Sequence, residues 1–275
     1  MKKPLLSVIV PTKNSERTID ACLKSIENQT YKNIEIIVVD NDSTDKTQEI
    51  TRKYTKLVFS KGPERSTQRN LGALKSKGDY LLFIDSDFEL SSDVIKDCVL
   101  LNHKSEVIDQ KIGGIIIPEE SFGEGFWAKC KALERSFYIG VDWIEAARFF
   151  PKDIFNEFKG FDEKLISGED WDLNQKIKTK YIITRINSFI KHDEGNLSFL
   201  QLLKKKMYYG TKIKSYSFKE ANSKDFEKQS SIIKRYGLFF ANPRKVFSNP
   251  VVGIGMLFMK TMEFGAVGIG HLLKK

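Results

Sequence analysis

Residues 80–87 read Tyr80-Leu81-Leu82-Phe83-Ile84-Asp85-Ser86-Asp87, a short apolar run that ends in two carboxylates. We expect the run to be a buried strand, because a continuous apolar segment of this length is typical of a parallel sheet. Residues two apart on a strand point the same way, so the pattern predicts that Asp85 and Asp87 project together. Oxygen ligands at that spacing suit Mg²⁺ or Mn²⁺. The alternative is a strand-end turn in which Asp87 caps the next element.

Similar apolar runs occur before and after this stretch. Short β-branched runs alternate with segments of helical period, which predicts βα units in a mostly parallel, Rossmann-like sheet flanked by helices. The expected strands cover residues 5–10, 34–39, 56–59, 80–84 and 112–117. The expected helices cover residues 19–26, a segment ending near 54, 67–77 and 92–103, followed by an aromatic-rich helix at 126–138. Residues 147 and 186–190 suggest further strands, and after about residue 196 the chain has only helical patterns. We therefore predict an α/β fold with a C-terminal helical appendage.

Two other strand ends carry polar residues. Asp40 ends the second expected strand, and Pro11-Thr12-Lys13-Asn14 ends the first. In an open parallel sheet, ligands bind beyond the carboxyl ends of the strands, where an acidic group can accept hydrogen bonds from a ribose or a base N–H. Three strand ends would then meet at a nucleotide-sized crevice, with the carboxylates of residues 85–87 beside a diphosphate. The alternative for Asp40 is an Asx turn and a helix cap, and for Asp42 to Asp45 we prefer that interpretation.

Composition excludes several classes of protein. The chain has 275 residues, 41% of them apolar, which is too apolar for a disordered protein. Its three cysteines, Cys22, Cys98 and Cys130, share no close spacing, so they predict neither a disulfide scaffold nor a zinc site. The formal charge is +9, but no Arg-rich aromatic stripe or nucleic-acid-binding motif is present, so we expect no nucleic-acid partner. The apolar stretch before Pro11 is too short for a signal peptide.

Four motifs together resemble the GT-A glycosyltransferases of family 2, over roughly residues 5–195. They are Ser7-Val-Ile-Val-Pro11-Thr12-Lys13-Asn14, Ile37-Val-Val-Asp40-Asn-Asp42-Ser43-Thr44-Asp45, Arg69-Asn70-Leu71-Gly72 and Asp85-Ser86-Asp87. The resemblance implies an inverting, metal-dependent enzyme that uses a nucleotide sugar. Its domains would be a catalytic domain at 1–195, with a nucleotide-binding half at 1–118 and an acceptor-binding half at 119–195, and a helical region at 196–275.

The resemblance also implies roles for single residues. The nucleoside pocket would be lined by Pro11, Thr12, Asn14 and Asp40, with Arg69 helping to hold the nucleotide and Asp87 binding Mg²⁺ or Mn²⁺. We add Asp42, Asp85 and Ser86 to the candidate nucleotide-binding residues. Gln68 departs from the pattern, because the family usually has a small residue there.

Three acidic residues begin the expected helix after the Gly160-Phe161-Asp162-Glu163 turn. Inverting transfer needs a carboxylate that takes the proton of the acceptor hydroxyl. By similarity to the family's Glu-Asp motif we assign Asp170 as this base and Glu169 as its acceptor-binding neighbour. Acidic residues also favour the first turn of any helix, and for Asp172 we prefer that explanation.

His192 is the one histidine with a candidate function. A neutral imidazole can complete the coordination of a metal that aspartates hold, or hydrogen-bond a departing phosphate. Many GT-A enzymes place a late histidine at the metal, so the resemblance supports a ligand role. A surface or core histidine is the alternative.

The C-terminal region predicts contact with a membrane surface. Lys204-Lys205-Lys206 lies near Leu, Phe and Tyr side chains, and residues 246–273 are apolar but interrupted by Lys260 and Glu263. Charges near the bilayer centre disfavour a spanning helix, so we expect these helices to lie in the interface of an anionic membrane. Packing on the catalytic core or a homodimer interface is the alternative. We expect a cytoplasmic protein, peripheral at the inner face of the cell membrane, with a glycan or polyprenyl-phosphate acceptor.

Two other functions remain as alternatives. The Gln-x-x-Arg-Trp signature of processive family members is missing, which favours addition of a single sugar. A sugar-phosphate nucleotidyltransferase would carry a Gly-rich basic loop after its first strand, which Pro11-Thr12-Lys13-Asn14 lacks. A catalytically silent, membrane-associated nucleotide-binding protein would tolerate loss of the metal or base carboxylates, all of which are present.

Overall fold

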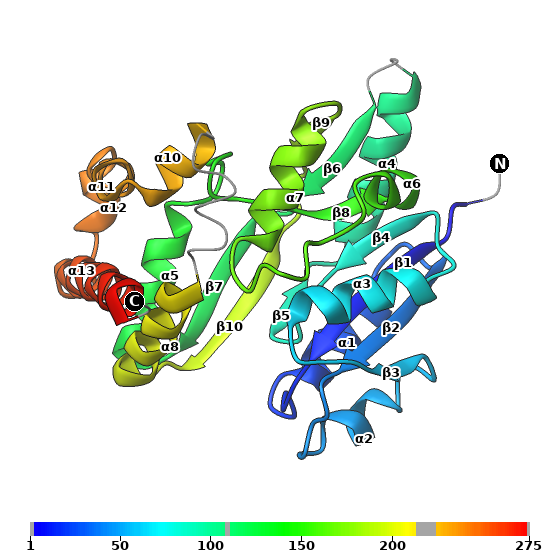
Figure 1. Cartoon of the computed structure of the whole chain (residues 1–275), viewed down its shortest axis with the longest axis horizontal. Helices are drawn as coiled ribbons and strands as arrows, with labels where there is room; N and C mark the ends of the chain where they lie inside the picture. Colours follow the sequence, from blue (N-terminus) through cyan, green and yellow to red (C-terminus); the bar gives the residue numbers. More distant parts are fainter. Residues whose placement is uncertain (1–2, 108–110, 213–223, 274–275) are drawn as a thin grey trace. The chain divides into compact units, whose positions relative to one another are not determined.

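The computed structural model describes residues 3–107, 111–212 and 224–273 (Figure 1). Internal contacts divide the chain into two units. The first, called the sheet unit, comprises Met1–Pro118, Ala146–Glu163 and Glu169–Lys191. The second, called the helical unit, comprises Glu119–Glu145, Lys164–Gly168 and His192–Lys275. Residues 119–145 therefore group with the C-terminal helices, and the domain limits 1–195 and 196–275 stay a prediction.

A seven-stranded sheet forms the centre of the sheet unit, in the order β3-β2-β1-β4-β8-β6-β9. The strands are β1 (Leu6–Thr12), β2 (Ile34–Asp40), β3 (Val58–Ser60), β4 (Tyr80–Phe83), β6 (Ile112–Ile116), β8 (Ala147–Pro151) and β9 (Ile182–Arg185). All neighbours pair in parallel except β8, which runs antiparallel to both β4 and β6. Thr12 lies opposite Asp40 in the register of β1 and β2. The carboxyl ends of these two strands therefore meet at one edge of the sheet.

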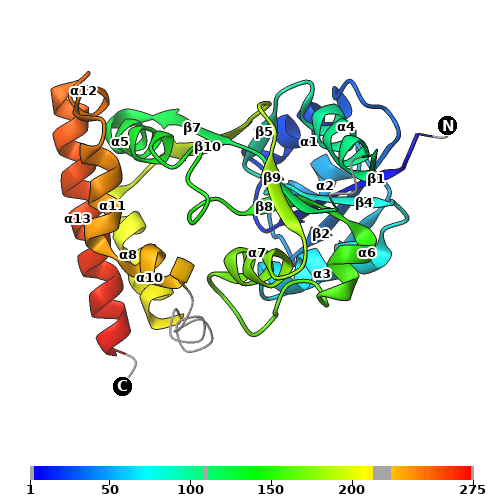
Figure 2. The same ribbon diagram turned by 90° about the horizontal axis from the view of Figure 1, so that it is seen from above.

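Helices cover both faces of this sheet, as Figure 2 shows. They are α1 (Ile19–Glu27), α2 (Thr47–Thr51), α3 (Arg65–Lys75), α4 (Val94–Val107), α6 (Lys152–Glu157) and α7 (Glu169–Lys178), and a short strand β5 (Phe88–Leu90) follows β4. Side chains of α1 and α4 pack with Val8 and Val10 of β1, whereas those of α3, α6 and α7 pack with Ile9. This alternation follows from the two-residue period of a strand, which sends neighbouring side chains to opposite faces.

The predicted fold class is confirmed: the chain is an α/β protein with a mostly parallel sheet, and C-terminal helices follow it. Two details differ from the prediction. β8 enters the sheet antiparallel, through pairs such as Leu81 with Phe150, and local sequence pattern carries no signal for such distant pairing. Residues 186–189, expected in a strand, instead link β9 to the next strand, β10 (Ile190–Asn196).

The helical unit contains β7 (Glu119–Glu124), which neighbours β10 in a small sheet, and a group of helices. The helices are α5 (Gly125–Ser136), α8 (Phe199–Lys212), α10 (Lys224–Ser230), α11 (Ile232–Phe240), α12 (Pro243–Val246) and α13 (Pro250–Leu273). α8 and α13 approach closely, because a Cβ at Gly270 would lie 2.0 Å from the carbonyl oxygen of Met207. By length and composition, α13 is the one helix among the described residues that qualifies to cross a membrane.

The long side chain of Gln68 is accommodated, at a position where the family usually has a small residue, by burial and hydrogen bonding. Its side chain is buried in the sheet unit, and its Nε2 donates hydrogen bonds to the carbonyl oxygens of Thr12, at 3.0 Å, and Val39, at 2.7 Å. These carbonyls belong to the ends of β1 and β2. Gln68 therefore ties α3 to the strand ends that carry the predicted nucleotide-binding residues.

We predict that Gln68→Leu lowers the free energy of unfolding by about 1–3 kcal/mol, because it removes two buried hydrogen bonds that contribute about 0.5–1.5 kcal/mol each. Urea unfolding followed by circular dichroism measures the change. Leu74→Ala on the same helix is the control, since Leu74 is 78% exposed and its loss should change little. An unfolding midpoint for Gln68→Leu equal to that of the control would contradict the assigned role.

Candidate active site

A buried arginine gathers carboxylates from distant parts of the sheet unit. Arg69 on α3 has a side chain only 2% exposed. One terminal nitrogen donates to Asp85 Oδ1 at 2.8 Å, and the other donates to Asp170 Oδ1 at 2.8 Å and to Glu169 Oε1 at 3.4 Å. The two regions that the sequence analysis assigned to the donor and to the acceptor therefore meet at one guanidinium, which we call the Arg69 cluster.

Electrostatic interactions keep Asp85 and Arg69 of this cluster ionised. Burial raises the pKa of Asp85, but the charges of Arg69, Arg148 and Arg65 outweigh it and hold that pKa well below its usual range. Burial lowers the pKa of Arg69, and the three carboxylates raise it above its ordinary value. Arg148 on β8 lies 3.5 Å from Asp85 Oδ2. The sequence analysis missed Arg148, because its place depends on the antiparallel insertion of β8 beside β4.

The acidic residues at the start of α7 differ in exposure. The Glu169 side chain is 5% exposed, and burial together with the charge of Asp170 raises its pKa to about 7, against the opposing effect of Arg69. The Asp170 side chain is 36% exposed, so solvent or a ligand can reach it. Asp172 is fully buried and forms an ion pair with Lys176 at 2.7 Å, which fits the structural role preferred for it.

Asn70, next to Arg69, fixes the turn that precedes α7. Its side-chain nitrogen donates to the carbonyl of Phe161 at 2.9 Å, and the Phe161 N–H donates back to its oxygen at 3.0 Å. Gly160 has a φ of 66°, and a Cβ there would lie 2.7 Å from the Asn70 side-chain oxygen. The Arg69-Asn70 pair thus joins α3 both to this turn and to the acidic residues beyond it.

Asp40 is a hydrogen-bonding centre at the ends of β1 and β2. It is 1% exposed and accepts bonds from the Thr12 hydroxyl at 2.8 Å, Gln48 Nε2 at 2.7 Å, and both the N–H and the hydroxyl of Ser43. Burial raises the pKa of Asp40, but these bonds outweigh it and hold the pKa below its ordinary value. A carboxylate has about four acceptor sites. A nucleoside N–H that binds Asp40 would therefore replace one of these donors.

Asn14 and Asp42 lie in left-handed turns beside Asp40, with φ values of 48° and 47°. Asn and Asp adopt this conformation more readily than other non-glycine residues. The Thr44 N–H donates to the Asn14 side chain at 2.9 Å, which joins the two loops. Asp42 is exposed and Pro11 is buried in β1. Asp45 accepts from the Thr47 N–H two residues later, as in an Asx turn, while the N-cap position of α2 is Lys46.

The Asp85-Ser86-Asp87 segment corrects one part of the sequence argument. β4 ends at Phe83, and both aspartates lie in the turn before β5, so the strand rule used to align their side chains does not apply. Asp85 faces Arg69 and Arg148, while the Ser86 hydroxyl lies 2.8 Å from that of Ser15. No group of three or more metal-ligating side chains is found within residues 3–107, 111–212 and 224–273.

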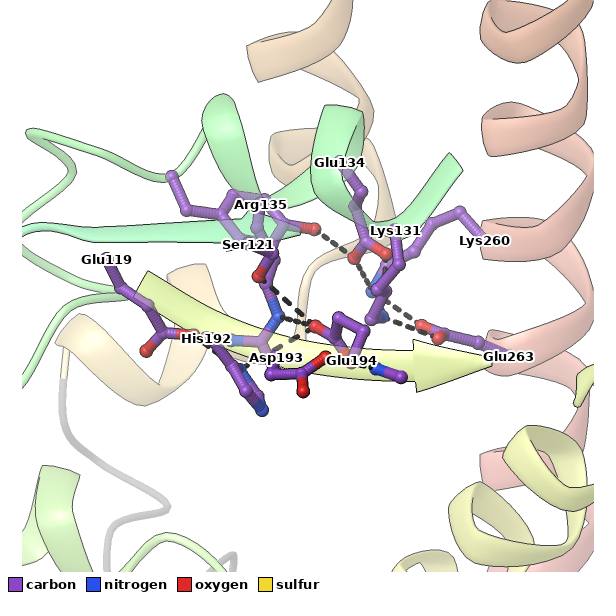
Figure 3. Close-up of polar contacts among 12 residues, drawn as sticks. Glu119, Ser121, Lys131, Glu134, Arg135, His192, Asp193, Glu194, Lys260 and Glu263 are labelled. Atoms are coloured by element: carbon purple, nitrogen blue, oxygen red, sulfur yellow. Dashed lines mark hydrogen bonds and ion pairs between the residues drawn. The ribbon is translucent and has the colours of Figure 1, made fainter. Parts of the chain in front are cut away.

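His192 belongs to the helical unit and lies on β10. Its Nδ1 is 2.9 Å from Glu119 Oε1 on β7, and 3.6 Å from Glu194 Oε1 (Figure 3). Arg135 of α5 forms ion pairs with both glutamates. A carboxylate on Nδ1 is the usual way to orient a histidine whose Nε2 binds a metal. The predicted ligand role of His192 stays a prediction.

Comparison with known proteins gives the family. Residues 7–137 match the family described as Glycosyl transferase family 2. A GalNAc(5)-diNAcBac-PP-undecaprenol beta-1,3-glucosyltransferase of Campylobacter jejuni is 26% identical over 266 residues, which cover 88% of this chain and 84% of the relative. An uncharacterized glycosyltransferase of Haemophilus influenzae is 38% identical over 115 residues, which cover 38% of this chain and 45% of the relative.

Solved structures of other proteins share this fold. The structure of the mannosyltransferase PcManGT from Pyrobaculum calidifontis, in complex with GDP-Man and Mn²⁺, has a TM-score of 0.64 and 15% identity, covering 100% of this chain and 88% of that one. At this identity the likeness concerns the fold alone. The chain is therefore a glycosyltransferase with the GT-A fold, and over residues 7–137 it is similar to glycosyltransferase family 2.

Proposed function

We propose that the chain transfers one sugar from a UDP- or GDP-linked donor to an acceptor, with inversion at the sugar carbon. The Arg69 cluster is the observation that carries this proposal. One guanidinium binds Asp85, at the edge expected to hold the donor, and Asp170, at the helix expected to serve the acceptor. A single displacement needs both reactants positioned at once, and a shared cation between the two sides favours that arrangement.

In this proposal the acceptor oxygen attacks the sugar carbon from the face opposite the diphosphate. The new C–O bond forms as the bond to the diphosphate breaks, the nucleoside diphosphate leaves with the electron pair, and Asp170 takes the hydroxyl proton. The exposure of Asp170 supports its choice over Glu169 as the base. Burial and the charge of Asp170 raise the pKa of Glu169, which favours a protonated Glu169 as a hydrogen-bond donor to the acceptor. A phosphate acceptor is already ionised, so there Asp170 would only orient it.

The nucleotide would bind at the ends of β1, β2 and β4. Pro11, Thr12, Asn14 and Asp40 are proposed for the nucleoside, with Asp42, Ser86, Asp85 and Arg69 near the phosphates. Support comes from the hydrogen bonds that join these loops, in which Asp40 binds Thr12 and Asn14 binds Thr44. The burial of Arg69 suggests that it acts on the nucleotide by positioning Asp85.

A divalent cation, Mg²⁺ or Mn²⁺, is proposed to neutralise the diphosphate charge. Asp87 is the proposed ligand by resemblance to the family motif, and its side chain is partly exposed in the turn before β5. A carboxylate oxygen suits either ion. The PcManGT structure contains Mn²⁺, which is consistent with this chemistry. His192 is retained as a proposed second ligand.

The proposed acceptor is lipid-linked, such as a polyprenyl-phosphate or an undecaprenol-diphosphate glycan. The name of the Campylobacter jejuni relative describes an acceptor of this kind. We therefore propose that the enzyme works at the cytoplasmic face of the cell membrane, as a peripheral protein. Homodimer formation through the C-terminal helices stays the alternative use of that region.

A panel of UDP- and GDP-sugars with Mn²⁺ or Mg²⁺ tests the donor and the metal together. We expect one donor to raise the melting temperature by several degrees, since saturation at about 100 times the Kd stabilises by about 2.7 kcal/mol. The metal-dependent part of this shift should disappear in Asp87→Ala, and the melting temperature without ligand should stay nearly unchanged. Glu89→Ala, two residues later, is the control. If no nucleotide sugar binds, the proposed function fails; if Asp87→Ala keeps the full metal requirement, only the ligand assignment fails.

Asp170→Asn tests the base. We expect it to bind the donor nearly as well as the wild type and to lower turnover by about a hundred- to ten-thousand-fold, the range for general-base catalysis. Asp153→Asn is the matched control, since Asp153 is also an acidic residue in the first turn of a helix and is 69% exposed. Radiolabelled sugar transfer gives the turnover and calorimetry gives donor affinity. Normal turnover in Asp170→Asn with a hydroxyl acceptor would exclude it as the base.

A further inference from the structure

The polarity of α13 is reversed relative to that of an ordinary surface helix. Its lysine and its glutamate, Lys260 and Glu263, are both buried, with exposed fractions of 8% and 2%, while His271 in its last turn is exposed. One exposed face carries large apolar side chains and no Asp, Glu, Lys or Arg. We call this face the apolar stripe; it consists of Val251, Ile254, Phe258, Met262, Ile269 and Leu272, each 40–68% exposed. A helix that turns its charges inward and its large apolar side chains outward is not adapted to water on that face.

A buried group of charges from α5, α8 and α13 fixes the rotation of α13, and in it Lys206 of α8 lies 3.9 Å from Glu263. Lys260 Nζ lies 2.7 Å from Glu134 and 3.0 Å from Glu263, and Lys131 Nζ lies 2.7 Å from each of the same glutamates (Figure 3). Lys131 and Glu134 belong to α5. Burial raises the pKa of Glu134, but the two lysines outweigh it and hold that pKa well below its usual value. Rotating α13 would leave buried charges without partners on both helices, which is strongly unfavourable.

The neighbouring helix argues against a spanning arrangement. A helix of 24 residues is about 36 Å long, enough to cross a bilayer. However, α8 packs along α13 at Gly210 and Gly270, and α8 exposes Lys204 and Lys205. If α13 crossed the bilayer with its packing intact, α8 would carry these lysines into hydrocarbon. With that packing kept, the apolar stripe can meet lipid only from the side, with the helix lying in the interface.

The formal charge of the C-terminal region indicates which partner binds the apolar stripe. Residues 197–275 contain 15 Lys and Arg but four Asp and Glu, a formal charge of +11, whereas residues 1–196 sum to −2. Arg244 is exposed shortly before α13, and the exposed Phe240 and Phe247 flank it. A second copy of the chain would bring this basic region against itself, which like charges oppose. An anionic lipid surface complements it.

We propose that the apolar stripe of α13 inserts into the interface of an anionic lipid bilayer, with the lysines and arginines of the helical unit facing the headgroups. The partner is a bilayer surface rich in anionic phospholipid. The biological sense of this docking rests on the proposed transfer to a lipid-linked acceptor, but the docking itself depends only on the surface of the helical unit.

Vesicle flotation tests the proposal with the full chain and no substrate. The wild type should float with vesicles of phosphatidylglycerol and phosphatidylcholine at low salt, and should float much less with phosphatidylcholine alone or at high salt. Ile254→Glu and Phe258→Glu should each weaken binding by about tenfold or more, because each replaces an inserted apolar side chain with a charge. Leu74→Glu is the matched control, because Leu74 is a large exposed apolar residue on α3 of the sheet unit.

The outcomes distinguish a lipid bilayer from a second copy of the chain as the partner of the apolar stripe. They also distinguish a failure of the membrane docking from a failure of the proposed function. If the wild type does not float at low salt, or if both stripe variants float as well as Leu74→Glu, the proposal is wrong. If light scattering shows a dimer that the stripe variants convert to monomer without any change in flotation, a second copy covers the stripe. Calorimetry with UDP, GDP and Mn²⁺ on the same proteins reports the proposed function independently. Intact nucleotide binding without flotation would overturn the docking and leave the function standing.

Discussion

The burial of Arg69 is the constraint on which the candidate site depends. A guanidinium that is 2% exposed needs carboxylates around it, since an unpaired buried charge is strongly unfavourable. Asp85, Glu169 and Asp170 supply them from the end of β4 and the start of α7. Because these residues are 16 to 101 positions from Arg69 in the chain, the ion pairs can form only when the sheet and α7 are assembled. The same interactions that stabilise the fold thus place Asp85, proposed for the donor side, beside Glu169 and Asp170, proposed for the acceptor side.

The sequence predicted those features of the site that local pattern determines. The apolar run before Asp85 and the β-branched run before Asp40 predicted two strand ends, and both strands are present and pair in parallel with β1. The features it missed depend on distant pairing or on the geometry of turns. Arg148 joins the cluster only because β8 inserts beside β4, and Asp87 lies in a turn whose direction the strand rule does not give. The motif that resembles family 2 supplied the role of Asp170, which spacing alone left open.

A similar limit applies to the C-terminal region. Lys260 and Glu263 were recognised in the sequence as interruptions of an apolar segment, but their partners Lys131 and Glu134 lie on α5, more than 120 residues away. Lys260 and Glu263 look unfavourable in an apolar helix, but their ion pairs with Glu134 and Lys131 fix the orientation of α13. They leave an uncharged face outward, and this is the physical basis for placing the helical unit on an anionic bilayer. The sequence showed where the charged residues lie along the helix, whereas only the packing against α5 shows that they lie on its buried face.

The central claim is that Arg69 serves the reaction by holding Asp170 as well as Asp85. A double-mutant cycle between Arg69→Lys and Asp170→Asn tests it most directly, because lysine keeps the positive charge but cannot bind several carboxylates through a planar fork. Turnover with the identified donor is measured in all four proteins. The account predicts that Arg69→Lys lowers turnover by about tenfold or more in the wild type. It predicts a clearly smaller loss when Asp170 is already Asn, because only the effect through Asp85 is then left. If the two losses multiply independently, Arg69 does not act through Asp170 and the account is contradicted.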